Sequence, residues 1–142
     1  MYIGLKHLHS YLAYLLLAAL IFSIVYVIIQ FVGKKSFTEK VRKVTLVGFI
    51  ATHLQLLIGL VLYLISPVGL SNFSSEAMSE SLSRLYVLEH PLTMLIGIIL
   101  VSIGYIKAKK PGDDARRFRT IIVFYGLGLI LMLSRIPWSV WP

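Results

Sequence analysis

The stretch "YLAYLLLAALIFSIVYVIIQFV", Tyr11 to Val32, decides the fold because it carries no charged residue over a length that crosses a lipid bilayer. A membrane-spanning helix needs about 20 apolar residues. Three further apolar stretches follow, over 44–65, 85–106 and 120–138. Membrane barrel strands are shorter, at about 10 residues, and alternate in polarity. The sequence therefore predicts an all-α fold, a bundle of four transmembrane helices that satisfy their own backbone hydrogen bonds in lipid.

The composition supports this prediction, since 58% of the residues are hydrophobic and 14% are charged, whereas soluble domains carry about 25% charged residues. The 142 residues suit a single integral membrane domain over 1–142, with helices at about 3–32, 41–65, 85–107 and 119–138. The absence of cysteine excludes disulfides, iron–sulfur clusters and thiolate metal sites. The first span lacks an early small-residue cleavage site, so we expect no cleaved signal peptide.

The distribution of positive charge predicts the orientation. The net charge is +8, and eleven of the 14 Lys and Arg residues lie in 33–43 and 107–119. The connection 66–84 holds only one basic residue, Arg84. Basic loops stay in the cytoplasm, so we expect both termini on the extracytoplasmic side of a bacterial inner (cytoplasmic) membrane. We therefore interpret the basic residues as contacts to the lipid bilayer, and we do not expect nucleic acid as a partner.

Ionisable side chains inside the spans are few, and their cost in hydrocarbon makes each a functional candidate. They are His53, Glu89, His90 and Arg135, with His7 and His9 at the entrance of the first span. A helical rise of about 1.5 Å per residue puts His53 roughly 15 Å from the basic end, near the bilayer centre. The same rise puts His90 roughly 25 Å from that end. We therefore expect the polar chemistry in the outer half of the bundle.

Helical spacing relates these residues to one another. His90, Gly97 and Gly104 are seven residues apart and form one stripe, which either leaves a groove for a flat group or lets another helix approach closely. His7 and His9 lie about 200° apart around a helix, so they cannot face the same partner. We expect His9 to point inward and His7 to have the lesser role.

Histidines on three of the four predicted helices favour haem b, whose iron takes axial imidazoles from facing helices of a bundle. The candidate iron ligands are His90, His53 and His9, and the candidate haem-binding residues also include His7 and Arg135. Arg135, Arg84 and Lys6 offer cations for the haem propionates. The estimated depths of the histidines in the bilayer are compatible with two pairs of iron ligands, His53 with His90 and His9 with His90. His90 is common to both pairs.

Two further interpretations compete with haem. His7, His9 and His90, with Glu89, offer nitrogen and oxygen ligands for a copper(II) or zinc ion at the outer face, or the histidines make interhelical hydrogen bonds in a non-redox accessory protein. Glu89 and His90 are also candidates to accept protons from a quinol beside the haem. Glu89 alone is typical of a first helical turn, where its charge suits the helix dipole.

Four segments carry a resemblance over nearly the whole chain: "HLHSYLAYLLL", "THLQLLIGLVLYLISPVGLSNFS", "RLYVLEHPL" and "YGLGLILMLSRIPWSVWP". In these the chain resembles small four-helix membrane proteins of Bacteroidota-type bacteria that are labelled cytochrome b or cytochrome b-like. The resemblance implies haem binding and membrane electron transfer, with His7, His9, His53 and His90 as candidate ligands. We expect a redox carrier, alone or as a subunit of a respiratory assembly, rather than a stand-alone enzyme, because the short loops provide no soluble substrate domain.

Overall fold

The computed structural model describes all 142 residues and confirms the all-α, four-helix fold. The four long helices are α1 (Tyr2–Val32), α2 (Glu39–Ile65), α5 (His90–Lys109) and α6 (Asp114–Ser134). A short helix α4 (Ser81–Arg84) and a π-helical turn η2 (Leu85–Glu89) extend α5, so that this apolar helix runs over Ser81–Lys109. All four helices are long and apolar enough to cross a membrane, as in a multi-pass membrane protein.

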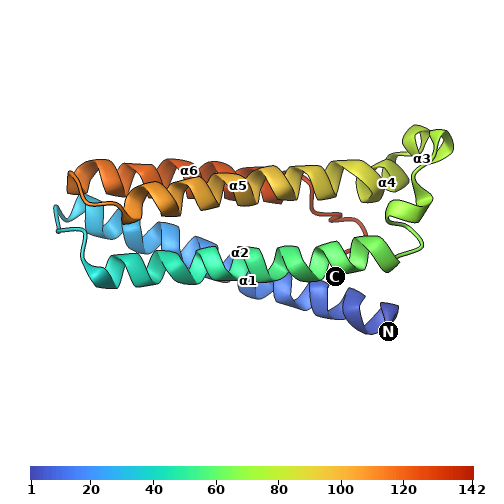
Figure 1. The fold of residues 1–142 in the computed structure, drawn as a ribbon, viewed down its shortest axis with the longest axis horizontal. Helices are drawn as coiled ribbons and strands as arrows, with labels where there is room; N and C mark the ends of the chain where they lie inside the picture. The colour runs from blue at the N-terminus through green and yellow to red at the C-terminus, as the bar shows by residue number, and fades with distance from the viewer.

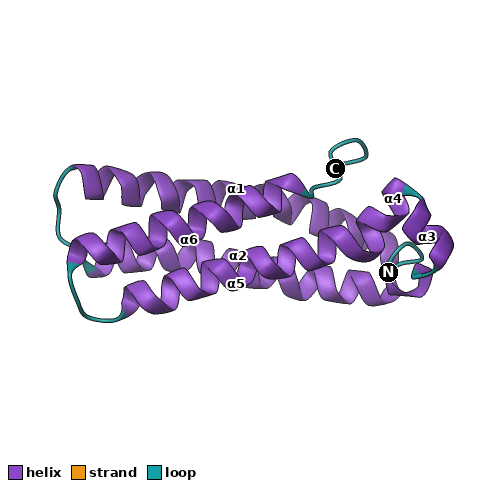
Figure 2. Cartoon of the chain, turned by 90° about the horizontal axis from the view of Figure 1, so that it is seen from above, coloured by secondary structure: helices purple, strands orange, loops and turns teal.

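The helices form an antiparallel ring in which α1 and α5 each contact both α2 and α6. The α1–α2 and α5–α6 turns, which carry most of the basic residues, share one end of the bundle (Figure 1). The N-terminus lies at the opposite end, beside the connection that contains η1 (Leu70–Asn72) and α3 (Ser75–Ser79), and Figure 2 shows the same arrangement from above. His9 and His90, near the starts of α1 and α5, therefore belong to the end away from the basic turns.

The ends of α6 differ from the sequence-based expectation of about 119–138. The helix begins at Asp114 because the Asp113 carboxylate accepts a 2.9 Å hydrogen bond from the Arg116 N–H and caps the first turn. It ends at Ser134, so the expectation that it continues to Trp138 is wrong. Pro137 has no N–H to donate and disfavours a helical conformation of the preceding residue. The remaining tail turns back toward α1, where Trp141 stacks on Tyr14 with ring centroids 4.2 Å apart.

Buried polar contacts join α2 to both α6 and α1. The fully buried Tyr125 hydroxyl on α6 donates a 2.7 Å hydrogen bond to the Thr45 carbonyl on α2. The Ser23 hydroxyl on α1 donates to the Val44 carbonyl at 2.9 Å. The outside of the bundle exposes large apolar side chains such as Leu57 and Ile130, which is the pattern expected of a surface that faces lipid.

The glycine stripe of α5 is filled by α6. A Cβ built at Gly128 would lie 2.8 Å from the Gly97 carbonyl oxygen, and one at Gly104 would lie 2.7 Å from the Cβ of Phe124. Contacts this short leave no room for a side chain between the helices. The stripe below His90 therefore serves close helix approach, and the alternative expectation, a groove for a flat group along Gly97 and Gly104, is wrong.

Candidate functional site

Two histidines from diagonally opposed helices meet at the end of the bundle away from the basic turns. The ring centroids of His9 on α1 and His90 on α5 lie 6.2 Å apart, and the ring planes are inclined by 79°. Both side chains are partly buried. The carbonyl of Arg135, directly after the end of α6, is level with them, since it lies 2.8 Å from the His90 ring. The pair therefore lies where α6 gives way to the C-terminal tail.

The backbone before His90 has an irregular turn with an identifiable cause. Pro91 has no N–H, and its ring disfavours a regular helical bond to the carbonyl four residues earlier, which belongs to Val87. In the turn before the proline, the His90 N–H bonds to the Leu85 carbonyl, five residues earlier rather than four, which makes the turn π-helical. The free Val87 carbonyl accepts a 2.8 Å hydrogen bond from the Tyr63 hydroxyl on α2. Single π-turns occur frequently at functional sites, and this one immediately precedes a site histidine.

The hydrogen bond of His90 determines which ring nitrogen is free. His90 Nδ1 lies 2.8 Å from the Arg135 carbonyl oxygen, which can only accept. Nδ1 therefore carries the proton, and Nε2 keeps its lone pair when the ring is neutral. Metal-binding histidines have this arrangement, in which a carbonyl orients the ring through the nitrogen that does not bind.

Around His9 the structure leaves polar atoms without partners. His9 Nδ1 and Gln55 Oε1 are both buried and form no hydrogen bond. The amide of Gln55 donates a 2.8 Å bond to the His9 carbonyl, which holds α2 against α1 at this level. Gly59, one turn further along α2, lies under the ring, since a Cβ there would be 3.0 Å from His9 Cε1. The His9 ring thus occupies a place that a side chain at Gly59 would restrict.

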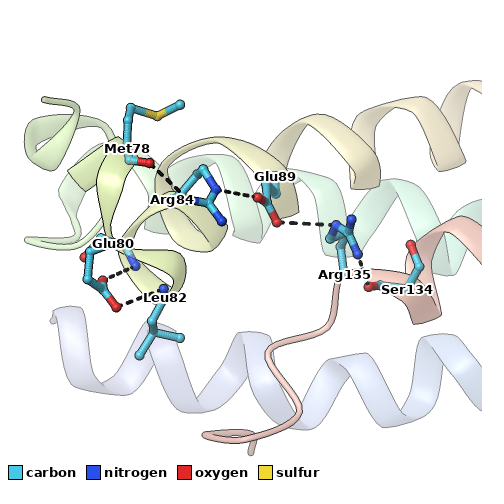
Figure 3. A network of polar contacts seen from close by, with 8 residues as sticks. Met78, Glu80, Leu82, Arg84, Glu89, Ser134 and Arg135 are labelled. Carbon is cyan, nitrogen blue, oxygen red and sulfur yellow. Dashed lines mark hydrogen bonds and ion pairs between the residues drawn. The ribbon is translucent and has the colours of Figure 1, made fainter. Parts of the chain in front are cut away.

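Figure 3 shows a cluster of three charged residues, Arg84, Glu89 and Arg135, of which Glu89 directly precedes His90 in the chain. The Glu89 carboxylate accepts from Arg84 at 2.8 Å and lies 3.4 Å from the Arg135 guanidinium. Arg84 also donates to the Met78 carbonyl at 3.0 Å. Glu89 is therefore the shared partner of two arginines rather than only a first-turn charge. With one carboxylate between two guanidinium groups, the cluster keeps a net positive charge. Lys6, the third expected cation, is exposed on α1 and forms no ion pair.

The other two histidines lie elsewhere. His53 has both ring nitrogens within hydrogen-bond distance of other groups, Nδ1 at 2.7 Å from the Phe49 carbonyl and Nε2 at 3.2 Å from the Ser102 hydroxyl. Ser102 follows His90 by twelve residues on α5, which is roughly 18 Å along the helix. His7 is exposed and stacks on Tyr11, with ring centroids 6.2 Å apart. The structure therefore brings His9 and His90 together and separates them from His53 and His7.

Three residues of this site, Gln55, Gly59 and Tyr63, were not anticipated from the sequence. They are spaced by four residues and so lie along one face of α2. The sequence did offer one signal for them: Gln55 is a polar amide inside a predicted span, where such a residue is a functional candidate, and Gly59 follows one turn later. No group of three or more His, Cys, Asp or Glu side chains is close enough to hold a metal ion. The expected outer-face ligands His7, His9, His90 and Glu89 accordingly do not converge.

Comparisons with protein-family models, with curated proteins and with solved structures find no match to this chain. The function is therefore inferred from the residues of this chain and their geometry.

Proposed function

We propose that the protein is a b-type cytochrome of the membrane, which holds haem between His9 and His90 and transfers electrons. The observation that carries the proposal is the 6.2 Å separation of the two imidazole centroids across the bundle. A transition metal that binds two imidazole nitrogens at about 2 Å each holds the ring centroids roughly 6 Å apart. The depth estimates from the sequence left two ligand pairs open, and this separation favours His9 with His90.

The chemistry of the surrounding atoms fits such a group. His90 presents a free Nε2 with its Nδ1 held by the Arg135 carbonyl, and His9 has a buried Nδ1 without a partner. Neutral imidazole is a usual axial ligand of haem iron in helical bundles. Bound haem would supply reversible one-electron chemistry, and the protein would tune its potential through axial ligation and burial.

The charged cluster supports the same proposal. Haem propionates need cations near the membrane surface, and Arg135 and Arg84 share the single carboxylate of Glu89 beside the histidine pair. Because the two arginines keep a net positive charge, they are suitable counterions for a propionate. His53 and His7 are not ligands in this proposal.

The proposed setting is the bacterial inner membrane, with the two basic turns in the cytoplasm and both termini on the extracytoplasmic side. The haem would then lie toward the outer leaflet. The connections between the helices are short and form no soluble substrate domain, so the electron donor and acceptor would be quinol in the bilayer or neighbouring respiratory subunits.

A second candidate function, a non-redox accessory protein, is favoured by one observation. His53 and His90 each make a hydrogen bond to a different element, to Ser102 on α5 and to the Arg135 carbonyl after α6. Such bonds hold membrane helices together without any cofactor. They leave the buried Nδ1 of His9 unexplained.

The deciding experiment is the visible spectrum of the protein purified in detergent from haem-replete cells, before and after reduction by dithionite. A Soret band and sharpened α and β bands on reduction support the cytochrome, and a colourless preparation overturns it. His9→Ala and His90→Ala should each lose the low-spin spectrum. His7→Ala, an exposed control, should keep it. Loss of haem in His53→Ala with retention in His9→Ala would overturn the ligand assignment.

A further inference from the structure

A hollow of about 380 Å³ lies at the α5–α6 turn, at the end of the bundle opposite the histidine pair. Its polar lining comes from the end of α5, the turn and the first two turns of α6, and consists of Lys107, Lys110, Asp113, Arg116, Arg117 and Thr120. Four of these six side chains are basic and one is acidic. Pro111 and Gly112 complete the wall, and a Cβ at Gly112 would have nothing within 4 Å.

The basic side chains of the hollow differ in how far they are already engaged. Arg117 donates to the Ala108 carbonyl at 2.7 Å, pairs with Asp114 at 3.5 Å and stacks over Phe37. It is therefore a fixed part of the wall.

Lys107, Lys110 and Arg116, by contrast, form no ion pair and no side-chain hydrogen bond with any residue of the chain. The Asp113 carboxylate is occupied by the Arg116 N–H at 2.9 Å. Three free cations thus face the hollow against one carboxylate that already caps a helix.

A second hollow of about 380 Å³ continues the first along α6 toward the membrane interior. The two share Asp113, Arg116 and Thr120, and the second adds a further basic residue, Arg119, and the apolar side chains of Val123 and Phe124. Val123 is 51% exposed on the face of the bundle that meets lipid. The Lys107 ammonium lies 5.6 Å from the centre of the Phe124 ring, where the basic and apolar parts meet. The combined groove is therefore cationic at the bundle end and apolar further along α6.

We propose that this groove binds an anionic phospholipid of the adjacent leaflet, with its phosphodiester between Lys107, Lys110 and Arg116. An acyl chain would lie on Val123 and Phe124. Basic pockets between transmembrane helices are suited to anionic headgroups. The α1–α2 turn is also basic, but neither hollow includes any of its residues. The α1–α2 turn therefore offers a matched basic surface outside the groove, against which a specific site can be distinguished from general attraction to a basic membrane face.

The test is a titration of delipidated protein with phosphatidylglycerol, followed by native mass spectrometry. The pocket variant is Lys110→Ala with Arg116→Ala, and the matched control is Lys34→Ala with Lys35→Ala, which removes the same charge from the other basic turn. All four side chains are exposed, so both variants should elute and melt as the unaltered protein does. We expect phosphatidylglycerol affinity to fall about 20-fold in the pocket variant, because two charge-assisted contacts to the phosphodiester are lost, and less than two-fold in the control, which loses none.

Equal losses in the two variants would overturn the proposal in favour of general surface attraction. So would binding of zwitterionic phosphatidylcholine as tightly as phosphatidylglycerol. Inorganic phosphate forms a third arm: if it binds to the same sites as tightly as the lipid does, the groove is a site for a soluble anion. None of these outcomes depends on haem, so they test the lipid site independently of the proposed electron transfer.

Discussion

The hydroxyl of Tyr63 on α2 donates a 2.8 Å hydrogen bond to the carbonyl oxygen of Val87, the carbonyl that Pro91 leaves without a helical partner. A proline near the start of α5 thus creates an unsatisfied acceptor inside the bundle, and a side chain from another helix satisfies it. The same contact fixes α2 against the π-helical turn that leads into His90. Tyr63 is therefore a positioning residue for the histidine pair, although it does not touch either ring.

Replacing Tyr63 by Phe should destabilise the bundle by about 1–3 kcal/mol, because it leaves the Val87 carbonyl buried and unpaired. The measurement is the thermal midpoint in detergent, which should fall by a few degrees. Tyr26→Phe is the matched control, since the Tyr26 hydroxyl on α1 makes no hydrogen bond. An equal midpoint in the two variants would show that the contact contributes nothing to stability.

Replacing Gly128 by Ala should cost about 1–3 kcal/mol, because the new methyl group would lie 2.8 Å from the Gly97 carbonyl and 2.9 Å from Val101. Gly126→Ala on the same helix is the control. A Cβ at Gly126 has nothing within 4 Å, and alanine favours a helix over glycine by roughly 1 kcal/mol. The two substitutions should therefore shift the thermal midpoint in opposite directions. A gain in stability from Gly128→Ala would contradict the close contact of α5 with α6.

Replacing Gly59 by Ala should weaken haem retention if the proposed ligand pair is correct. The added methyl group would lie 3.0 Å from His9 Cε1, so the ring must move by a few tenths of an ångström. Displacing a ligand by this amount should lower the haem content and change the low-spin spectrum while the helical content stays the same. Gly126→Ala again serves as control. An unchanged spectrum in Gly59→Ala would argue against His9 as a ligand.

Replacing Glu89 by Gln should lower stability by about 1 kcal/mol at low salt, since it leaves Arg84 and Arg135 without their common carboxylate. The three side chains are partly solvated, so the difference from the unaltered protein should shrink as the salt concentration rises. Thermal midpoints measured at low and high salt test this. The control is Glu76→Gln, because Glu76 is exposed and forms no ion pair. A difference that does not depend on salt would show that the cluster acts through packing rather than charge.

The pH dependence of the α4 segment should follow Glu80. Hydrogen bonds from the Ser83 hydroxyl and from the N–H groups of Ser83 and Leu82 hold the pKa of Glu80 below its ordinary 4.5. A lowered carboxyl pKa contributes stability above the unfolded value, and this is lost as the pH falls through the folded value. Hydrogen-exchange protection over 81–84 should therefore decrease below pH 4.5, and Glu80→Gln should abolish that decrease.

Hydropathy and charge were sufficient to predict the all-α fold and the four spans, because length and polarity alone determine which segments suit lipid. They could not predict the partner of His90, since depth along a helix does not say which helices are diagonal neighbours. His53 shows the difficulty clearly. Its depth made it a candidate for the pair, and only the structure shows both of its ring nitrogens engaged, with Phe49 and Ser102.

The arrangement of the turns has a consequence for assembly. The chain pairs α1 with α2 and α5 with α6 across short connections, so the contacts within each hairpin are local in sequence and can form early. In the proposed orientation each hairpin could insert as one unit, with its basic turn left on the side of synthesis. His9 belongs to the first hairpin and His90 to the second. The proposed haem could therefore be captured only once the two halves have met, which would make cofactor binding the closing step of folding rather than its nucleus.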